Sequence, residues 1–171
     1  MSTRLSLSNE GLTVRLLEDT DYDLLAALQL DDCTRGVSYK TIKACDWHLR
    51  EVLELTSTVA IRLPDAYLPS VVVSSKLKHY MLDDDLIVIF KGTRWNGASG
   101  PTLDPECSRL GTLVHDCLYH GVGAGLAISR QEADRAFLSC LIAAGMVLPR
   151  AYLWYGAVRL FGGLWSTYVE N

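Results

Sequence analysis

The sequence lacks the features that identify several large classes of protein. Its five cysteines form no CxxC pair, and its lysines and arginines are scattered rather than clustered. An odd, scattered set of cysteines suggests reduced thiols, and the polar N-terminus predicts no secretory leader, so an intracellular protein is expected. Surfaces that track phosphates need a basic stripe, so nucleic acid is not an expected partner.

Long apolar runs and the common ligand-binding motifs are missing too. The longest apolar run, residues 136–148, contains Ser139 and Gly145 and is too short to cross a bilayer, so a core helix is expected there. The chain has no HExxH motif, no Walker lysine and no GxGxxG spacing. Zinc-protease, P-loop and dinucleotide-binding chemistry are therefore not indicated.

The composition that remains is that of a globular protein. Hydrophobic residues make up 49% of the 171 positions, charged residues 21%, and the net charge is −4. This length suits one domain with a modest extension. The pattern changes near residue 70, so we expect a partly helical extension over residues 1–70 and a domain over residues 71–171.

The first 55 residues predict one strand and two helices. Residues 12–17 alternate weakly between apolar and polar, as in a short strand. Residues 19–30 open with capping and acidic side chains and then acquire helical spacing. Residues 41–55 fit the same helical spacing.

Strands are expected next, followed by a glycine-rich loop. Residues 71–73 are β-branched, and residues 80–82 and 86–90 flank three consecutive aspartates, which predicts a β-hairpin. The hairpin leads into the loop over residues 91–101, which contains three glycines and ends at Pro101.

Helical spacing returns in the C-terminal part. Helices are expected from Pro105 past residue 120, from Ser129 to about Gly145, and from Pro149 to residue 161. Ser129 and Glu132 have the spacing of a capping box. The predicted fold class is α+β, with a β-hairpin followed by an antiparallel helix pair and a C-terminal helix.

The first of these helices carries polar side chains in an apolar setting. His115 and Tyr119 are four residues apart and share one face, and Asp116 points about a quarter-turn away. Buried polar groups must be paired, bound to a metal or used in chemistry. An antiparallel second helix can bring Asp134 to the His115 ring, where its carboxylate would fix the tautomer and stabilise the imidazolium.

Asp116 is expected to face the glycine-rich loop. A carboxylate combined with free backbone carbonyls makes a set of hard oxygen ligands, which suits calcium.

Two resemblances follow from these residues. The segment Val114-His-Asp-Cys-Leu-Tyr119 resembles the active-site helix of phospholipase A2, and the loop before it and the Ala133-Asp134 pair after it resemble the disulfide-free parvovirus capsid enzyme. Four segments also resemble a family of tailed-phage and prophage proteins of unknown function, over roughly residues 78–165. They are Asn96-Gly-Ala-Ser, Leu113-Val-His-Asp, Glu132-Ala-Asp-Arg-Ala-Phe and Ala157-Val-Arg-Leu-Phe-Gly.

The phospholipase resemblance implies a calcium-dependent hydrolase of phospholipid esters. His115 would take a proton from water, Asp134 would orient it, and Tyr119 would support Asp134. Gly97 would donate its N–H to the oxyanion. The expected calcium ligands are Asp116 and atoms of the 95–100 loop, namely Trp95, Gly97, Ser99 and Gly100.

The phage resemblance implies a protein of the host cytoplasm or of the virion. The candidate partners are a phospholipid or membrane surface and other virion proteins.

Several alternatives stay open at this stage. The same His-Asp-Tyr network would suit a non-catalytic virion-associated or accessory protein, and another envelope ester or amide is an alternative substrate. Asp116 and His120 are four apart and could share a zinc ion, and the Cys117 thiol could act as a nucleophile. The aromatic residues of the last helix would suit an interfacial lipid surface, although a third core helix explains them at least as well.

Overall fold

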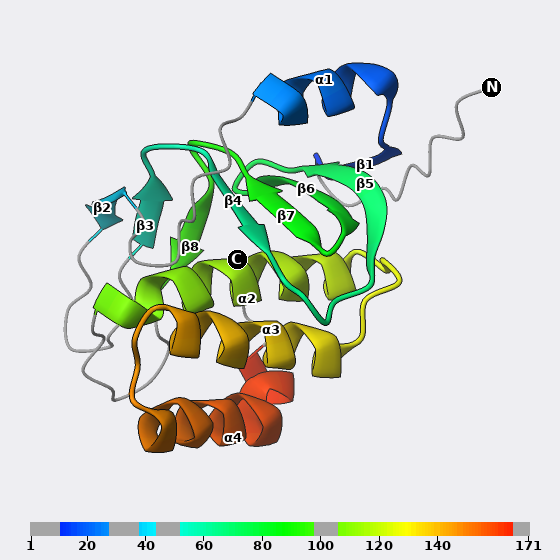
Figure 1. The fold of residues 1–171 in the computed structure, drawn as a ribbon. Helices are drawn as coiled ribbons and strands as arrows, with labels where there is room; N and C mark the ends of the chain where they lie inside the picture. The colour runs from blue at the N-terminus through cyan, green and yellow to red at the C-terminus, as the bar shows by residue number, and fades with distance from the viewer. Residues whose placement is uncertain (1–10, 28–37, 44–51, 98–105, 166–171) are drawn as a thin grey trace.

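Two antiparallel sheets and four helices make up the described part of the chain (Figure 1). The computed structural model describes residues 11–27, 38–43, 52–97 and 106–165. In Figure 1 the sheets lie above helix α2, and helices α3 and α4 form successive layers below it. This arrangement confirms the predicted α+β class.

The larger sheet has five strands in the order β1-β5-β6-β7-β4. The strands are β1 (Thr13–Leu16), β4 (Val59–Arg62), β5 (Leu68–Ser74), β6 (His79–Asp84) and β7 (Leu86–Ile89). Strands β6 and β7 form the predicted hairpin. Asp84 has a φ of 52° at its turn, a left-handed conformation that aspartate tolerates better than most residues.

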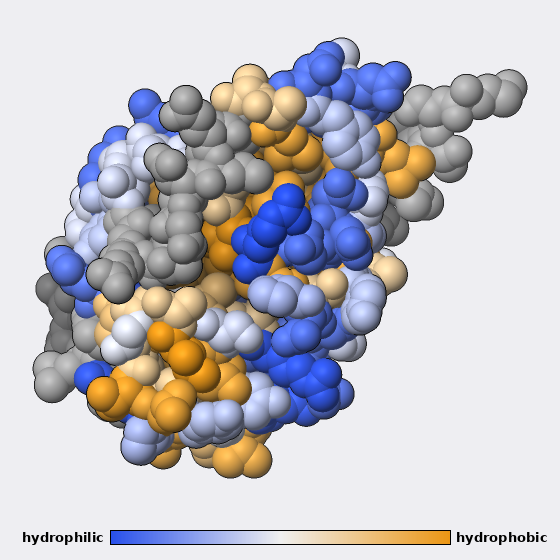
Figure 2. Space-filling view, in the orientation of Figure 1, coloured by the Kyte–Doolittle hydropathy of each residue, from blue (hydrophilic) through white to orange (hydrophobic). Residues whose placement is uncertain are grey.

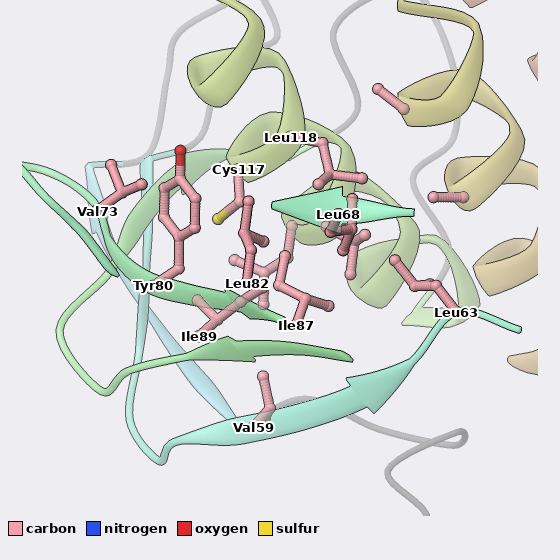
Figure 3. Packing of buried hydrophobic residues seen from close by; sticks show 14 of the residues in the cluster. Val59, Leu63, Leu68, Val73, Tyr80, Leu82, Ile87, Ile89, Cys117 and Leu118 are labelled. Carbon is pink, nitrogen blue, oxygen red and sulfur yellow. The ribbon is translucent and has the colours of Figure 1, made fainter. Parts of the chain in front are cut away.

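The two faces of this sheet are covered by different helices. Val73, Leu82 and Ile87 point toward α2 and pack with Cys117 and Leu118 (Figure 3). Val72, Met81 and Val88 alternate with them and pack on the opposite face with Leu25 of α1 (Asp19–Ala27). The sheet therefore fixes the position of α2, which lies beneath it in Figure 1.

The smaller sheet has three strands in the order β2-β3-β8. They are β2 (Tyr39–Lys43), β3 (Val52–Leu55) and β8 (Arg94–Asn96). Strand β8 lies inside the segment 91–101 that was predicted as a loop, and it brings Asn96 to Asp116 of α2.

Three helices follow: α2 (Glu106–Gly123), α3 (Arg130–Ala143) and α4 (Leu148–Trp165). The predicted capping box is present, because the Ser129 side chain accepts from the Glu132 N–H and the Glu132 carboxylate accepts from the Ser129 N–H. Helices α2 and α3 run antiparallel (Figure 1). They approach so closely at Gly111 that an added Cβ would lie 2.9 Å from Leu141.

Three predictions about the chain need correction. The helix expected over residues 41–55 is wrong, because β2 and β3 occupy its described ends. Leu53 and Leu55 are buried while Val52 and Glu54 are half-buried. This two-residue period belongs to a strand and was hidden by apolar residues that also fit a helical spacing.

The last helix does not end before Gly162, because α4 continues to Trp165. The boundary expected at residue 70 lies inside β5. Strands β1 and β4, from the expected extension, pair with β5 and β7. The first 70 residues thus contribute two strands to the main sheet.

Cys107, Cys117 and Cys140 are free thiols. Within the described ranges, no helix combines the length and the apolarity that crossing a membrane requires.

Candidate active site

The carboxylate of Asp134 lies where α2, α3 and α4 meet. Asp134 itself is on α3 and is fully buried. His115 of α2 places Nε2 2.9 Å from Oδ1, and the Tyr119 hydroxyl donates to the same oxygen at 2.7 Å. Arg159 of α4 donates from Nη1 to Oδ2 at 2.8 Å. Both carboxylate oxygens are therefore used by side chains from neighbouring helices.

These hydrogen bonds determine the ionisation of Asp134. Burial by itself raises the pKa of a carboxyl group, but the hydrogen bonds from His115, Arg159 and Tyr119 outweigh it and lower the pKa of Asp134. At neutral pH the group is an ionised carboxylate, which only accepts hydrogen bonds. Nε2 of His115 must therefore carry the proton in this contact.

The His115 ring lies against two aromatic rings and is mostly buried. Its centroid lies 4.1 Å from that of Tyr119 and 4.9 Å from that of Phe137. About 13% of the side chain is exposed, and no described residue forms a hydrogen bond to Nδ1. In a neutral ring with the proton on Nε2, the Nδ1 lone pair is free to accept a proton from water.

The sequence predicted that His115, Tyr119 and Asp134 lie together. It did not predict that Arg159 and Arg130 contact this group. Arg130 donates from Nε to the Tyr119 hydroxyl at 3.4 Å. A signal for Arg159 did exist, since it is the only charged residue in the apolar stretch 151–165. A lone cation in such a helix needs a partner.

Asp116, about a quarter-turn from His115 around α2, faces β8 as expected. Its Oδ2 accepts from the backbone N–H of Asn96 at 3.3 Å. Burial raises the pKa of Asp116, and the positive charge of Lys78 opposes that shift. Lys78 is buried and donates from Nζ to the Arg94 carbonyl at 3.4 Å.

Lys78 and Asp116 therefore both bind backbone groups along the edge of β8 that faces away from β3. In an antiparallel strand, the C=O of one residue and the N–H two residues later point to the same side. Here those groups belong to Arg94 and Asn96, and they are met by an ammonium and a carboxylate. The pair satisfies backbone groups that an edge strand would otherwise leave open.

The remaining residues of the expected calcium site are only partly described. Trp95 is buried, pairs with Leu53 in the β3–β8 ladder and donates from Nε1 to the Thr112 hydroxyl at 3.3 Å. Gly97 directly follows β8. Ser99 and Gly100 lie outside the described residues.

The described part of this site does not fit calcium. Asp116 receives a backbone N–H, and the neighbouring charge is the ammonium of Lys78, which repels a divalent cation. Among the residues described, no three His, Cys, Asp or Glu side chains are grouped to hold a metal ion. Calcium binding stays a prediction, and no step below depends on it.

His120 lies in a separate contact under the sheet. Its Nδ1 is 3.0 Å from the Tyr80 hydroxyl, whereas Asp116 faces Asn96. Burial, together with the charge of Lys78, lowers the pKa of His120 to about 4. Asp116 and His120, the pair considered as alternative zinc ligands, thus have other partners.

Burial also raises the pKa of the Cys117 thiol to about 12. Cys117 is therefore a poor nucleophile at neutral pH.

The low pKa of His120 predicts a loss of stability in acid. The unfolded chain binds this proton near pH 6.5 and the folded chain only near pH 4. The free energy of unfolding should therefore fall as the pH drops from 6.5 to 4, by on the order of 2–3 kcal/mol. Urea denaturation at several pH values measures this slope. His120→Gln should remove most of it, and a variant with the wild-type slope would contradict the assignment.

Gly162 of α4 lies directly against Tyr119, and an added Cβ would be 2.7 Å from its hydroxyl. Gly162→Ala should push this hydroxyl off Asp134. We expect a loss of about 1–3 kcal/mol in stability and up to about 10²-fold in any activity that depends on the site. Gly156→Ala is the matched control, since no heavy atom lies within 4 Å of its added Cβ. It should stabilise α4 by up to about 1 kcal/mol. Identical behaviour of the two variants would contradict the close contact at Gly162.

Comparisons with protein-family models, curated proteins and solved structures found no match to this chain. The proposals below therefore depend on the geometry described above and on the resemblances stated for the sequence.

Proposed function

We propose that this protein is a hydrolase that uses His115 to activate water for attack on an ester carbonyl. The observation that carries the proposal is the contact of His115 Nε2 with the buried Asp134 carboxylate. It places one nitrogen of the imidazole against an ionised acid, while about 13% of the His115 side chain stays exposed to solvent. A histidine arranged in this way is a general base.

The first step is proton transfer to Nδ1 of His115 as water attacks the carbonyl carbon. The positive charge that forms on the ring is stabilised by Asp134, 2.9 Å away. Tyr119 and Arg159 hold this carboxylate in place and keep it ionised. The protonated ring then returns its proton to the leaving alkoxide, so atoms and charge balance without a nucleophilic serine or cysteine.

The oxyanion needs a donor that the loop after β8 is expected to supply. Gly97 begins this loop, next to the Asn96 N–H that contacts Asp116. A backbone N–H aimed at the oxyanion would stabilise it.

The substrate class proposed is a phospholipid ester, and the setting proposed is a phage or prophage. Both come from the resemblances of residues 78–165. A membrane envelope is the structure on which such an activity would act, and other virion proteins would then be its neighbours.

The direct test is release of fatty acid from phospholipid vesicles by the purified full chain. The assay is run with calcium and with a chelator, for wild-type protein and for His115→Gln. Release by wild type but not by the variant supports the proposal. Equal release by both proteins would remove His115 from the mechanism, and a strict calcium requirement would show that the metal binds despite Lys78.

A second candidate is a non-catalytic protein of the virion. It is favoured by one observation, that Asp134 ties three helices together. Such a network would stabilise helix packing without turnover. This candidate predicts that wild-type protein releases no fatty acid and that His115→Gln lowers stability. Mass spectrometry of purified particles would then find the chain among the virion proteins.

A further inference from the structure

Helix α4 buries only a narrow stripe of its surface. Ala151, Trp154 and Gly162 are buried on one side, the last two facing Phe137 and Tyr119. The outer side is apolar and exposed, with Leu153 at 71% and Leu160 at 76%. A soluble helix normally presents polar residues there. The exposed apolar residues of α4 and of the turn before it are Val147, Leu148, Tyr152, Leu153, Leu160 and Phe161.

We call these six residues the α4 outer face. Figure 2 shows apolar side chains gathered over α4 and its connection to α3, at the lower left of the molecule. Singly exposed apolar residues are ordinary on a protein surface, but a contiguous set marks an interaction site.

The charges around the outer face are positive, although the whole chain carries a net charge of −4. Residues 130–165 contain four arginines and two acids, and because Asp134 is paired with Arg159, three arginines and Glu132 remain. Arg150 and Arg159 are nine residues apart, which puts them on opposite sides of the helix. Leu153 and Leu160 are seven apart and lie on one line between them.

An apolar face with aromatic residues and flanking arginines matches the chemistry of an anionic bilayer surface. The apolar side chains can enter the acyl boundary, while Arg150, the flanking arginine that is not paired with Asp134, can bind lipid phosphates. A protein partner with an apolar groove would not need the flanking cations. The observations therefore favour lipid over a second protein chain.

The outer face is continuous with the candidate active site. Arg159, at its edge, donates to Asp134, and Gly162, directly after Phe161, contacts Tyr119. The segment that would touch lipid thus also carries part of the His115 network. A bilayer bound here lies beside the site.

We propose that the outer face of α4 is a docking surface for membranes that contain anionic phospholipid. Docking itself does not require turnover. Only its role in delivering substrate to His115 rests on the proposed hydrolase function.

The test is co-sedimentation of the full chain with vesicles of phosphatidylcholine alone and of phosphatidylcholine mixed equally with phosphatidylglycerol. Wild-type protein should bind the mixed vesicles at least tenfold more tightly, and binding should weaken in high salt. The double variant Leu153→Ser/Leu160→Ser should bind at least tenfold more weakly than wild type.

The matched control is Leu16→Ser/Tyr67→Ser, which removes two similarly exposed apolar side chains from outside α4, at 62% and 80% exposure. It should bind as wild type does. His115→Gln should also bind the mixed vesicles as wild type does. The docking result can therefore be interpreted even if the hydrolase proposal fails. Equal binding by both double variants, or no binding by wild type, would overturn the proposal. The proposal would also be overturned if wild-type protein were a dimer that bound no vesicles and Leu153→Ser/Leu160→Ser converted that dimer to a monomer.

Discussion

Replacing His115 by glutamine is expected to lower ester hydrolysis by about 10²–10⁴-fold, because it removes the group that we propose accepts a proton from water. Glutamine has an amide N–H that can still donate to Asp134, so the packing of the three helices should survive. The measurement is initial-rate release of fatty acid from vesicles at neutral pH. The KM should change little, since His115 is proposed to act on water and not to bind substrate.

His79 provides the control for this result. Its ring packs against Phe90, with centroids 4.5 Å apart, away from Asp134. His79→Gln should keep the wild-type rate. A loss shared by both variants would indicate a general effect on folding and would count against His115 as the base.

The second large effect is on stability. Asp134→Ala removes an acceptor from His115, Tyr119 and Arg159 at once, and it leaves their donors around an apolar side chain. Breaking a buried ion pair in this way costs about 3–5 kcal/mol. Because Arg159 is 38% exposed and can be hydrated, we expect the lower end, about 3 kcal/mol. Urea or thermal denaturation at pH 7 measures it.

The control variant is Asp23→Ala, which removes an exposed carboxylate from α1. Its free energy of unfolding should stay within about 0.5 kcal/mol of wild type. If Asp134→Ala were as stable as Asp23→Ala, the hydrogen bonds of Asp134 to α2 and α4 would not contribute to the stability of the fold.

The contribution of Asp134 to stability should also depend on pH. Its folded pKa is lowered from 3.8, so its contribution is present above that pH and is lost as the pH falls toward the folded value. The window lies below that of His120, which acts between pH 6.5 and about 4. The two contributions to acid unfolding are therefore separable.

Local sequence signals predicted the parts of the fold that neighbouring residues decide. The capping box of Ser129 and Glu132 fixed the start of α3, and the short connection from α2 made the helix pair antiparallel. With both helices placed, the contact between His115 and Asp134 followed from their positions on the helix faces. That contact is 2.9 Å long.

The parts that were missed depend on long-range packing. Strand β3 exists because it pairs with β8, which lies about 40 residues later in the chain. Its apolar residues alone fitted a helix equally well. Arg159 was missed for the same reason, since only the layer order of α2, α3 and α4 brings α4 onto Asp134.

The glycines of α4 show a similar limit. Gly162 reads as a helix breaker when local propensity alone is considered. In the structure its missing Cβ instead leaves room for the Tyr119 hydroxyl, from which an added Cβ would be only 2.7 Å away. A close approach between two helices cannot be deduced from the sequence of one of them, because it depends on the side chains of both helices.

The most direct test of this account is the protonation state of the His115 ring. Long-range ¹H–¹⁵N correlation spectra of uniformly labelled protein at pH 7 distinguish the two tautomers, and the His115→Gln spectrum assigns the signals. We predict that the neutral ring carries its proton on Nε2 and leaves Nδ1 bare, because of the contact with Asp134. A neutral ring with its proton on Nδ1, or two neutral tautomers in rapid exchange, would contradict a histidine oriented by that carboxylate.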